Sequence, residues 1–437
     1  MQAATEEEER LLELLTPERW KELGLKDVLV TDSRMTPAGV EADLELSGNM
    51  SREKLTDATD RLRLLLDVED DHPLVILPRG RARRARLAVR TRRVTEEMDM
   101  LWHPGRSGIG VDSVTGSVVN LPLNSQIQVA GAKGSGKSWA FRPLMASLVT
   151  SPHHEMVFMD PKVVEGGTWK GVVPTYFPGE FADALEEGVE DMYARRDLMQ
   201  REGATVWRPE FGPYRIYMVD EGREFLSDLK LADKRAERLR KAKNREASAE
   251  DLLKDDDESG ALLNLIRISS MGRAWGVYVW WATQYPIVSG NNPGMDTNVD
   301  ANADWRFCLR VAKRKHADVA LDDDADYGPH LLTADDRNRG FGYLGGHGPS
   351  LIQTWTLTDE MIPLLAYPDH GRGQWPRDAA LAALRGQPNA LWTPDLLATH
   401  TGCGRVQAAR FLNSFSREGL MRTVGDKFLL ADCAGSR

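Results

Sequence analysis

The stretch at residues 131–138, GAKGSGKS, limits what this chain can fold into more than any other segment. It matches the pattern G-x-x-x-x-G-K-[S/T] in full. Its glycines, Gly131, Gly134 and Gly136, let the backbone wrap around an anion and point N–H groups at it. An apolar run (127–130) precedes the loop and a helical pattern (139–148) follows it. A chance match is therefore disfavoured, and the segment predicts a phosphate-binding loop between a strand and a helix.

The loop also predicts roles for its side chains. Lys137 is expected to reach the β- and γ-phosphates of ATP, and the Ser138 hydroxyl to ligate Mg²⁺. The expected nucleotide-binding residues are Gly131, Ala132, Lys133, Gly134, Ser135, Gly136, Lys137 and Ser138.

A second acidic element is needed on a neighbouring strand, and residues 215–221 (RIYMVDE) supply it. Asp220 is expected to hold the Mg²⁺ through water, and Glu221 to orient or deprotonate the attacking water. Such a pair alone is common in turns. Together with the loop it predicts ATP hydrolysis as well as binding.

Between residues 102 and 365, short apolar runs alternate with helical segments. This alternation predicts an α/β domain with a mostly parallel sheet that is covered on both faces. The runs are 127–130, 156–159, 215–219, 277–282, 305–311 and 341–344. A charged segment, 229–260, is expected to be a mobile or helical excursion outside the core.

Residues 1–95 predict a small α+β domain with two helical segments (5–23 and 51–68) and four strands. Its last part is strongly basic, because eight arginines fall between residues 79 and 93. Two interpretations remain open for them. The arginines form a solvated sheet face beside an acidic neighbour, or they contact phosphates.

After a Gly/Pro-bearing linker (370–389), residues 390–437 predict a winged helix: a short helix, a helix at 405–418 and a hairpin. Four polar side chains share one face of the second helix and suit the major groove of DNA: Gln407, Arg410, Ser414 and Arg417. A winged helix used for protein contact is the alternative.

Composition excludes several classes of protein. The chain has 437 residues, 41% of them hydrophobic, so global disorder is excluded, and its formal net charge is −10. The three cysteines lack zinc or redox spacing, which favours a reducing compartment. No segment reads as a signal peptide or as a membrane span. A cytoplasmic location is expected, with any membrane contact made through a membrane-associated transfer partner.

Several motifs, taken in order, resemble the motor domain of FtsK/SpoIIIE-type DNA translocases over about residues 102–365. They are VFMDPKVVEGGTW (157–169), MYARRDLMQREGA (192–204), VDEGREF (219–225), GRAWGVYVWWATQYP (272–286), DANADWRFCLRV (300–311) and GFGYLGG (340–346). The resemblance implies a RecA-like domain, assembly into a hexameric ring, and double-stranded DNA driven through the central channel. The 1–95 domain resembles, more weakly, the small domain that precedes this motor.

The resemblance implies further site residues. Arg273 falls on the arginine that acts in trans on the neighbour's ATP, and Gln284 falls on a polar sensor of the γ-phosphate. Asp160 and Lys162 match the D-P-K segment, and Arg306 matches an arginine four residues after Asn302; these matches do not specify roles.

The sequence departs from the family at Trp139, which follows Ser138, at Tyr285, in the 229–260 insertion and in the expected lack of membrane segments. Arginine outnumbers lysine, as in high-GC hosts. The chain thus resembles the double-stranded DNA transfer (Tra) proteins of actinobacterial conjugative or integrative elements. A ring ATPase of a type VII-like protein secretion system and a chromosome-segregation DNA pump are the alternatives.

Overall fold

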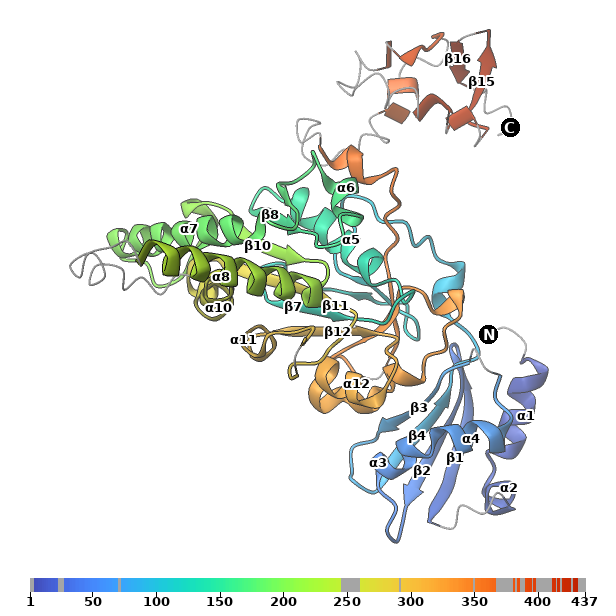
Figure 1. The fold of residues 1–437 in the computed structure, drawn as a ribbon. Helices are drawn as coiled ribbons and strands as arrows, with labels where there is room; N and C mark the ends of the chain where they lie inside the picture. The colour runs from blue at the N-terminus through green and yellow to red at the C-terminus, as the bar shows by residue number, and fades with distance from the viewer. Residues whose placement is uncertain are drawn as a thin grey trace.

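The computed structural model describes residues 4–22, 27–69, 72–244, 260–290, 292–348 and 350–366. Beyond these it describes 380–381, 383–385, 390–394, 396–397, 411–413, 415–416, 419–425 and 427–430. Figure 1 shows a large central sheet with helices on its faces, and a smaller N-terminal sheet beside it.

The central sheet has ten strands in the order β6-β5-β14-β13-β12-β7-β11-β10-β8-β9. Neighbouring strands from β12 to β9 pair in parallel, and the others pair antiparallel. Their bounds are β5 Gly110–Asp112, β6 Val118–Val119, β7 Ile127–Ala130, β8 His154–Met159, β9 Thr175–Tyr176, β10 Tyr214–Val219, β11 Val277–Thr283, β12 Trp305–Leu309, β13 Phe341–Leu344 and β14 Ile352–Thr354. The predicted α/β fold with a mostly parallel sheet is confirmed, and the antiparallel extension was not foreseen.

Helices cover both faces of the parallel strands because those strands are apolar on both sides. All seven residues of β11 are buried. Trp280 packs against Phe141 on one face, whereas Trp281 packs against Phe225 on the other, as the two-residue period of a strand requires. The first face carries α5 (Lys137–Val149) and α6 (Glu165–Trp169). The second carries α7 (Phe181–Arg201), α8 (Gly222–Asn244) and α10 (Ala261–Met271). Two short helices, α11 (Thr297–Ala301) and α12 (Arg314–Leu321), flank β12.

The N-terminal sheet is antiparallel, in the order β1-β2-β4-β3. Its strands are β1 Val28–Thr36, β2 Gly39–Leu46, β3 Leu74–Pro78 and β4 Arg84–Val89, and its helices are α1 Glu6–Leu14, α2 Pro17–Glu22, α3 Arg52–Asp57 and α4 Thr59–Leu66. Each predicted helical segment is therefore two helices. Pro17 starts the second one, because proline suits the first turn of a helix and not its interior.

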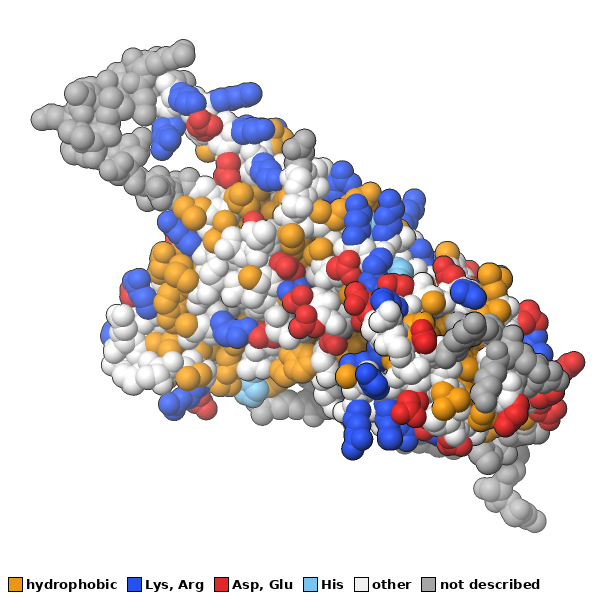
Figure 2. All heavy atoms as spheres, turned by 90° about the horizontal axis from the view of Figure 1, so that it is seen from below, with side chains coloured by type: hydrophobic (Ala, Val, Ile, Leu, Met, Phe, Trp, Pro, Cys, Tyr) orange, Lys and Arg blue, Asp and Glu red, His pale blue; other side chains and the backbone are white. Residues whose placement is uncertain are grey.

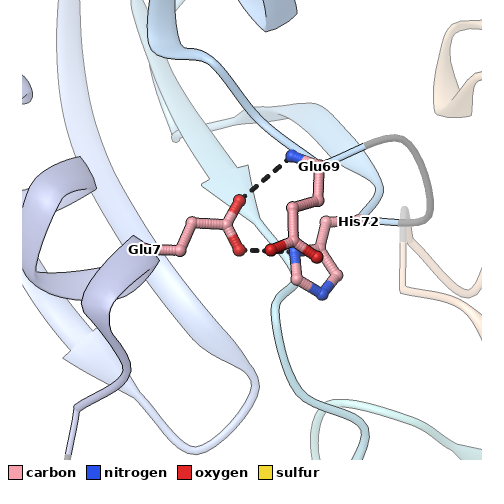
Figure 3. A group of neighbouring side chains, drawn as sticks. All are labelled: Glu7, Glu69 and His72. Atoms are coloured by element: carbon pink, nitrogen blue, oxygen red, sulfur yellow. Dashed lines mark hydrogen bonds and ion pairs between the residues drawn. The ribbon is translucent and has the colours of Figure 1, made fainter.

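A hydrogen bond and an ion pair link α1 to the turn after α4 (Figure 3). Glu7 accepts a bond from the backbone N–H of Glu69 at 3.1 Å and pairs with the His72 ring at 2.7 Å. One ligand-type atom from each of the three side chains lies within 4.8 Å of the others. This contact holds the first helix against the sheet.

The arginine-rich segment pairs largely with carboxylates of its own sheet. Arg86 bonds to Asp43 at 2.8 Å and Arg90 bonds to Glu41 at 3.1 Å, and both carboxylates are buried in β2. Arg79 also pairs with Asp43, and Arg92 pairs with Glu8. The acidic neighbour is confirmed for these four arginines, but the solvated face is not, because the side chains of Arg86, Arg90 and Arg92 are at most 25% exposed. Phosphate contact stays a prediction for the exposed Arg81, Arg83 and Arg84.

The predicted excursion at 229–260 begins inside the core, which corrects its first boundary. Leu229 of α8 is fully buried among the residues of α7 and α10. Beyond it α8 projects from the body, and Lys and Arg side chains gather on its end (Figure 2). They are Lys234, Arg235, Arg238, Arg240 and Lys241. Residues 245–259 lie outside the described part of the chain.

The described C-terminal residues form a small apolar core around Trp392, Leu412 and Phe415. Ala380 and Leu384 are buried in the same core, so part of the predicted linker belongs to it. The predicted hairpin is present as β15 (Met421–Val424) and β16 (Lys427–Leu430). Gln407, Arg410, Ser414 and Arg417 lie outside the described residues. Among the helices of the described part, none combines the length and apolar character needed to cross a membrane.

Candidate nucleotide site

The predicted phosphate loop connects the end of β7 to the start of α5. Gly134 and Gly136 have φ angles of 80° and 91°, in the left-handed region that favours glycine. A Cβ on Gly136 would lie 2.7 Å from the backbone nitrogen of Gly340, so a larger residue would not fit there. The helix begins at Lys137. Its first N–H groups therefore join those of the loop in one anion-binding cradle.

Lys137, Ser138 and Asp220 converge at this loop. The Lys137 ammonium lies 3.1 Å from Asp220 Oδ1, and the Ser138 hydroxyl donates to the same oxygen at 3.1 Å. Lys137 and Asp220 are both buried. A hydroxyl beside a carboxylate is a donor set that suits Mg²⁺. The buried Ser135 hydroxyl has no hydrogen-bond partner among the described residues, which also fits a loop shaped for a ligand.

The prediction that Asp220 lies on a neighbouring strand is wrong. Asp220 follows β10, and β11 separates β10 from β7. The two groups still meet, because parallel strands place their carboxyl ends on one edge and the long Lys137 side chain reaches across β11.

Glu221 is held between Gln284 and Lys162, the lysine of the D-P-K segment. Its Oε2 accepts from the Lys162 ammonium at 2.8 Å, and its Oε1 accepts from the Gln284 backbone N–H at 3.3 Å. Lys162 lies in the loop after β8, where the buried Asp160 carboxylate accepts from the N–H groups of Lys162 and Gly166, both at 2.8 Å. The structure thus places the D-P-K segment beside Glu221, a contact that the sequence did not reveal.

Arg273 lies near the amino ends of the parallel strands, whereas the phosphate loop lies at their carboxyl ends. Arg273 belongs to the 3-10 helix η3 (Gly272–Trp275), just before β11, whereas Thr283 at the far end of β11 pairs with Ala130 beside the phosphate loop. At about 3.3 Å per residue, the two ends of β11 are about 20 Å apart. The Arg273 side chain is 53% exposed and pairs with Asp304. The chain's own phosphate loop is therefore beyond its reach.

Arg306 has structural contacts. Its guanidinium donates to Gln128 Oε1 at 2.7 Å, to Asp300 Oδ1 at 2.6 Å and to the Asp300 backbone oxygen at 2.6 Å. These bonds join β12 to β7 and α11. Asn302, the other residue of that motif, donates to the Asn298 carbonyl at 2.7 Å.

A cavity of about 200 Å³ lies at the phosphate loop. Its lining includes Gln284 and two residues that no motif indicated as part of the site, Trp139 and Arg339. Arg339 comes from the segment before β13, about 200 positions after the loop, and belongs to no motif that would have signalled it. Trp139 was visible only as a bulky residue in an unusual place.

The geometry of a phosphate loop with an acidic pair agrees with a comparison to known families. Residues 92–288 match the FtsK/SpoIIIE family. That match covers 197 of the 437 residues. The resemblance deduced from the motifs is therefore confirmed.

Known proteins in this comparison include Protein Tra of Streptomyces lividans, which is 30% identical over 325 residues. That alignment covers 73% of this chain and 50% of Protein Tra. The DNA translocase FtsK of Staphylococcus epidermidis is 30% identical over 209 residues, covering 41% of this chain and 22% of FtsK. The chain thus spans about half the length of the first relative and less of the second.

Solved structures of similar fold include the pCW3 conjugation coupling protein TcpA, determined as a monomer with ATPγS. The identity is 15% and the TM-score 0.48, with 82% of this chain and 96% of TcpA covered. The cytoplasmic domain of the Thermomonospora curvata type VII secretion ATPase EccC has 18% identity and a TM-score of 0.41, covering 59% of this chain and 30% of EccC.

Proposed function

We propose that this chain is an ATP-driven motor that moves double-stranded DNA during conjugative transfer of a plasmid or integrative element. The convergence of Lys137, Ser138, Asp220 and Glu221 at one loop carries the enzymatic part of this proposal. The FtsK/SpoIIIE-family domain and the similarity to Protein Tra support DNA and conjugation.

In the proposed site, the loop backbone and Lys137 bind the phosphates, while Ser138 and Asp220 hold Mg²⁺. When bound, the metal ion would neutralise the negative charge that develops on the phosphate oxygens. Glu221 accepts a proton from the attacking water or orients it. The bonds from Lys162 and from the Gln284 N–H hold the Glu221 carboxylate in place, and Gln284 lines the cavity where a γ-phosphate would lie.

The position of Arg273 supports assembly into a ring, for which six subunits are proposed from the family. An exposed guanidinium on the edge away from its own loop is suited to a neighbouring subunit's ATP. The RecA-like domain (102–365) would then be the motor, with the small α+β domain (1–95) on one side and the winged helix (390–437) on the other.

The substrate is tested by measuring ATP hydrolysis with duplex DNA, with single-stranded DNA and without DNA. We expect duplex DNA to stimulate hydrolysis most, and the stimulation to fall steeply as salt rises, because phosphate contacts release counterions. If the rate of ATP hydrolysis is the same with and without DNA, the proposal is contradicted and a motor for protein secretion is favoured. The same assay over fragments of a transferable element measures sequence preference.

A second prediction concerns the winged helix, proposed to read short DNA repeats through Gln407, Arg410, Ser414 and Arg417. Arg410→Ala in the full chain should cost about 1–3 kcal/mol of discrimination between sites if Arg410 is bidentate to guanine. ATP hydrolysis without DNA should not change. The discrimination is measured by competition binding of DNA fragments to the unmodified chain and to Arg410→Ala, at two salt concentrations. Equal sequence preference in both proteins would assign this helix to protein contact.

A further inference from the structure

Trp139 and Arg339 line the cavity at the phosphate loop together with the residues of the loop itself. We propose that these two side chains form a nucleoside diphosphate subsite. The Trp139 indole packs against the nucleoside, and the Arg339 guanidinium binds the α- and β-phosphates. This inference rests on the proposed function, since it assumes that the loop binds a nucleotide.

Trp139 is unusual among the tryptophans of the described domain. Trp102, Trp169, Trp280 and Trp281 are fully buried, whereas Trp139 is 40% exposed and borders the cavity. Tryptophan side chains are highly buried on average, so an exposed indole beside a ligand site is a candidate for contact with the ligand. A flat apolar ring with one accessible face is a suitable stacking platform for a base or sugar.

The other face of the indole is covered, which fixes its orientation. The Arg142 guanidinium carbon lies 4.6 Å from the Trp139 ring centroid, a cation–π contact. Arg142 is itself buried and donates to both carboxylate oxygens of Glu165, at 2.6 and 3.0 Å. Burial alone would lower the pKa of Arg142, but the bonds and charge of Glu165 raise it, so the cation is permanent. The platform is therefore built before any ligand arrives.

Arg339 is held at the loop through the backbone of the next residue, Gly340. The Gly340 N–H donates to the Ser135 carbonyl at 3.0 Å, and a Cβ on Gly136 would lie 2.9 Å from Arg339 Cγ. The stem of Arg339 thus lies against the part of the loop whose N–H groups cradle the α- and β-phosphates in this motif. Lys137 and Glu221 occupy the γ-phosphate side. The geometry therefore directs Arg339 toward the two phosphates that ATP and ADP share.

The guanidinium of Arg339 is available for this contact. Its side chain is 56% exposed, and the carboxylate that it pairs with in the described part of the chain is Asp336, at 3.1 Å. The Asp336 side chain is 90% exposed, so the pair is weak and easily exchanged. Two phosphates offer a stronger, bidentate partner.

The test uses the full chain and compares two ligands, ADP and inorganic pyrophosphate, each with Mg²⁺, by titration calorimetry. Trp139→Ala should weaken ADP binding roughly tenfold or more and leave pyrophosphate binding unchanged, because only ADP has a nucleoside. Arg339→Ala should weaken both ligands by roughly tenfold to a hundredfold, with partial recovery in Arg339→Lys. Arg208→Ala, at an exposed arginine near the amino ends of the strands, is the matched control and should change neither affinity.

The outcomes separate the inference from the function on which it rests. If the unmodified chain binds neither ligand, the proposed ATP site itself is wrong. If it binds ADP but Trp139→Ala does so equally well, the nucleoside contact is wrong. Loss of pyrophosphate binding in Trp139→Ala would show that the indole only supports the loop. Unchanged affinities in Arg339→Ala would remove the phosphate contact.

Discussion

Replacing Glu221 with glutamine is expected to abolish ATP turnover while ATP binding persists. Glutamine preserves the size of the side chain, and its oxygen can still accept from the Gln284 N–H, so the loop and the metal ligands should stay in place. What is lost is the carboxylate that takes the proton from water. Loss of a general base typically lowers the rate about 10²–10⁴-fold. In this variant the steady-state rate of ATP hydrolysis should therefore fall, while the equilibrium affinity for ATP should stay the same.

The matched variant for this experiment is Lys137→Ala. Removing that ammonium takes away the main cation for the β- and γ-phosphates and leaves the buried Asp220 without its ion-pair partner, so both binding and turnover should be lost. Near-normal turnover in Glu221→Gln would remove Glu221 from the chemistry. Loss of ATP binding in the same variant would instead show that the Glu221 carboxylate organises the loop.

The sequence predicted the elements that depend on local patterns. The loop glycines, the strand before them and Asp220–Glu221 at a strand end all follow from short-range chemistry, namely backbone conformation and apolar runs. The strand bounds of β7 and β13 were predicted residue for residue. Which face of the sheet Trp280 and Trp281 each occupy could not be predicted, because the strand is apolar on both faces.

What the sequence did not reveal depends on contacts between distant segments. The insertion of β11 between β7 and β10 is a matter of strand order, which no local pattern encodes. The salt bridge between Lys162 and Glu221 joins residues 59 positions apart. Arg339 reaches the phosphate loop only because Gly340 bonds to Ser135. An exposed arginine before a strand looks the same in sequence wherever its side chain lies.

The proposed role of Arg273 across a subunit interface predicts a second large effect. Arg273→Ala should lower ATP turnover about 10³–10⁵-fold, the range that such arginines contribute elsewhere, because charge on the transferred phosphoryl group loses a stabilising cation. ATP binding should change little, since the loop, Lys137 and Ser138 lie about 20 Å away along β11. Hydrolysis and binding measured on the assembled protein give both values. A matched control is Arg215→Ala, because Arg215 is a partly exposed arginine near the start of the neighbouring strand β10 and pairs with Glu155.

The decisive form of this experiment mixes two inactive proteins. In a ring that contains both Arg273→Ala and Lys137→Ala subunits, some interfaces combine the intact loop of the first with the intact arginine of the second. Those interfaces should hydrolyse ATP, so the mixture should regain activity that neither protein has alone. The distance along β11 makes this recovery a specific expectation, because an arginine that acted within its own chain could not complement a neighbour's loop. If rings shown to contain both proteins stay inactive, the exposed Arg273 is a partner of Asp304 and not a contributor to the next subunit's site.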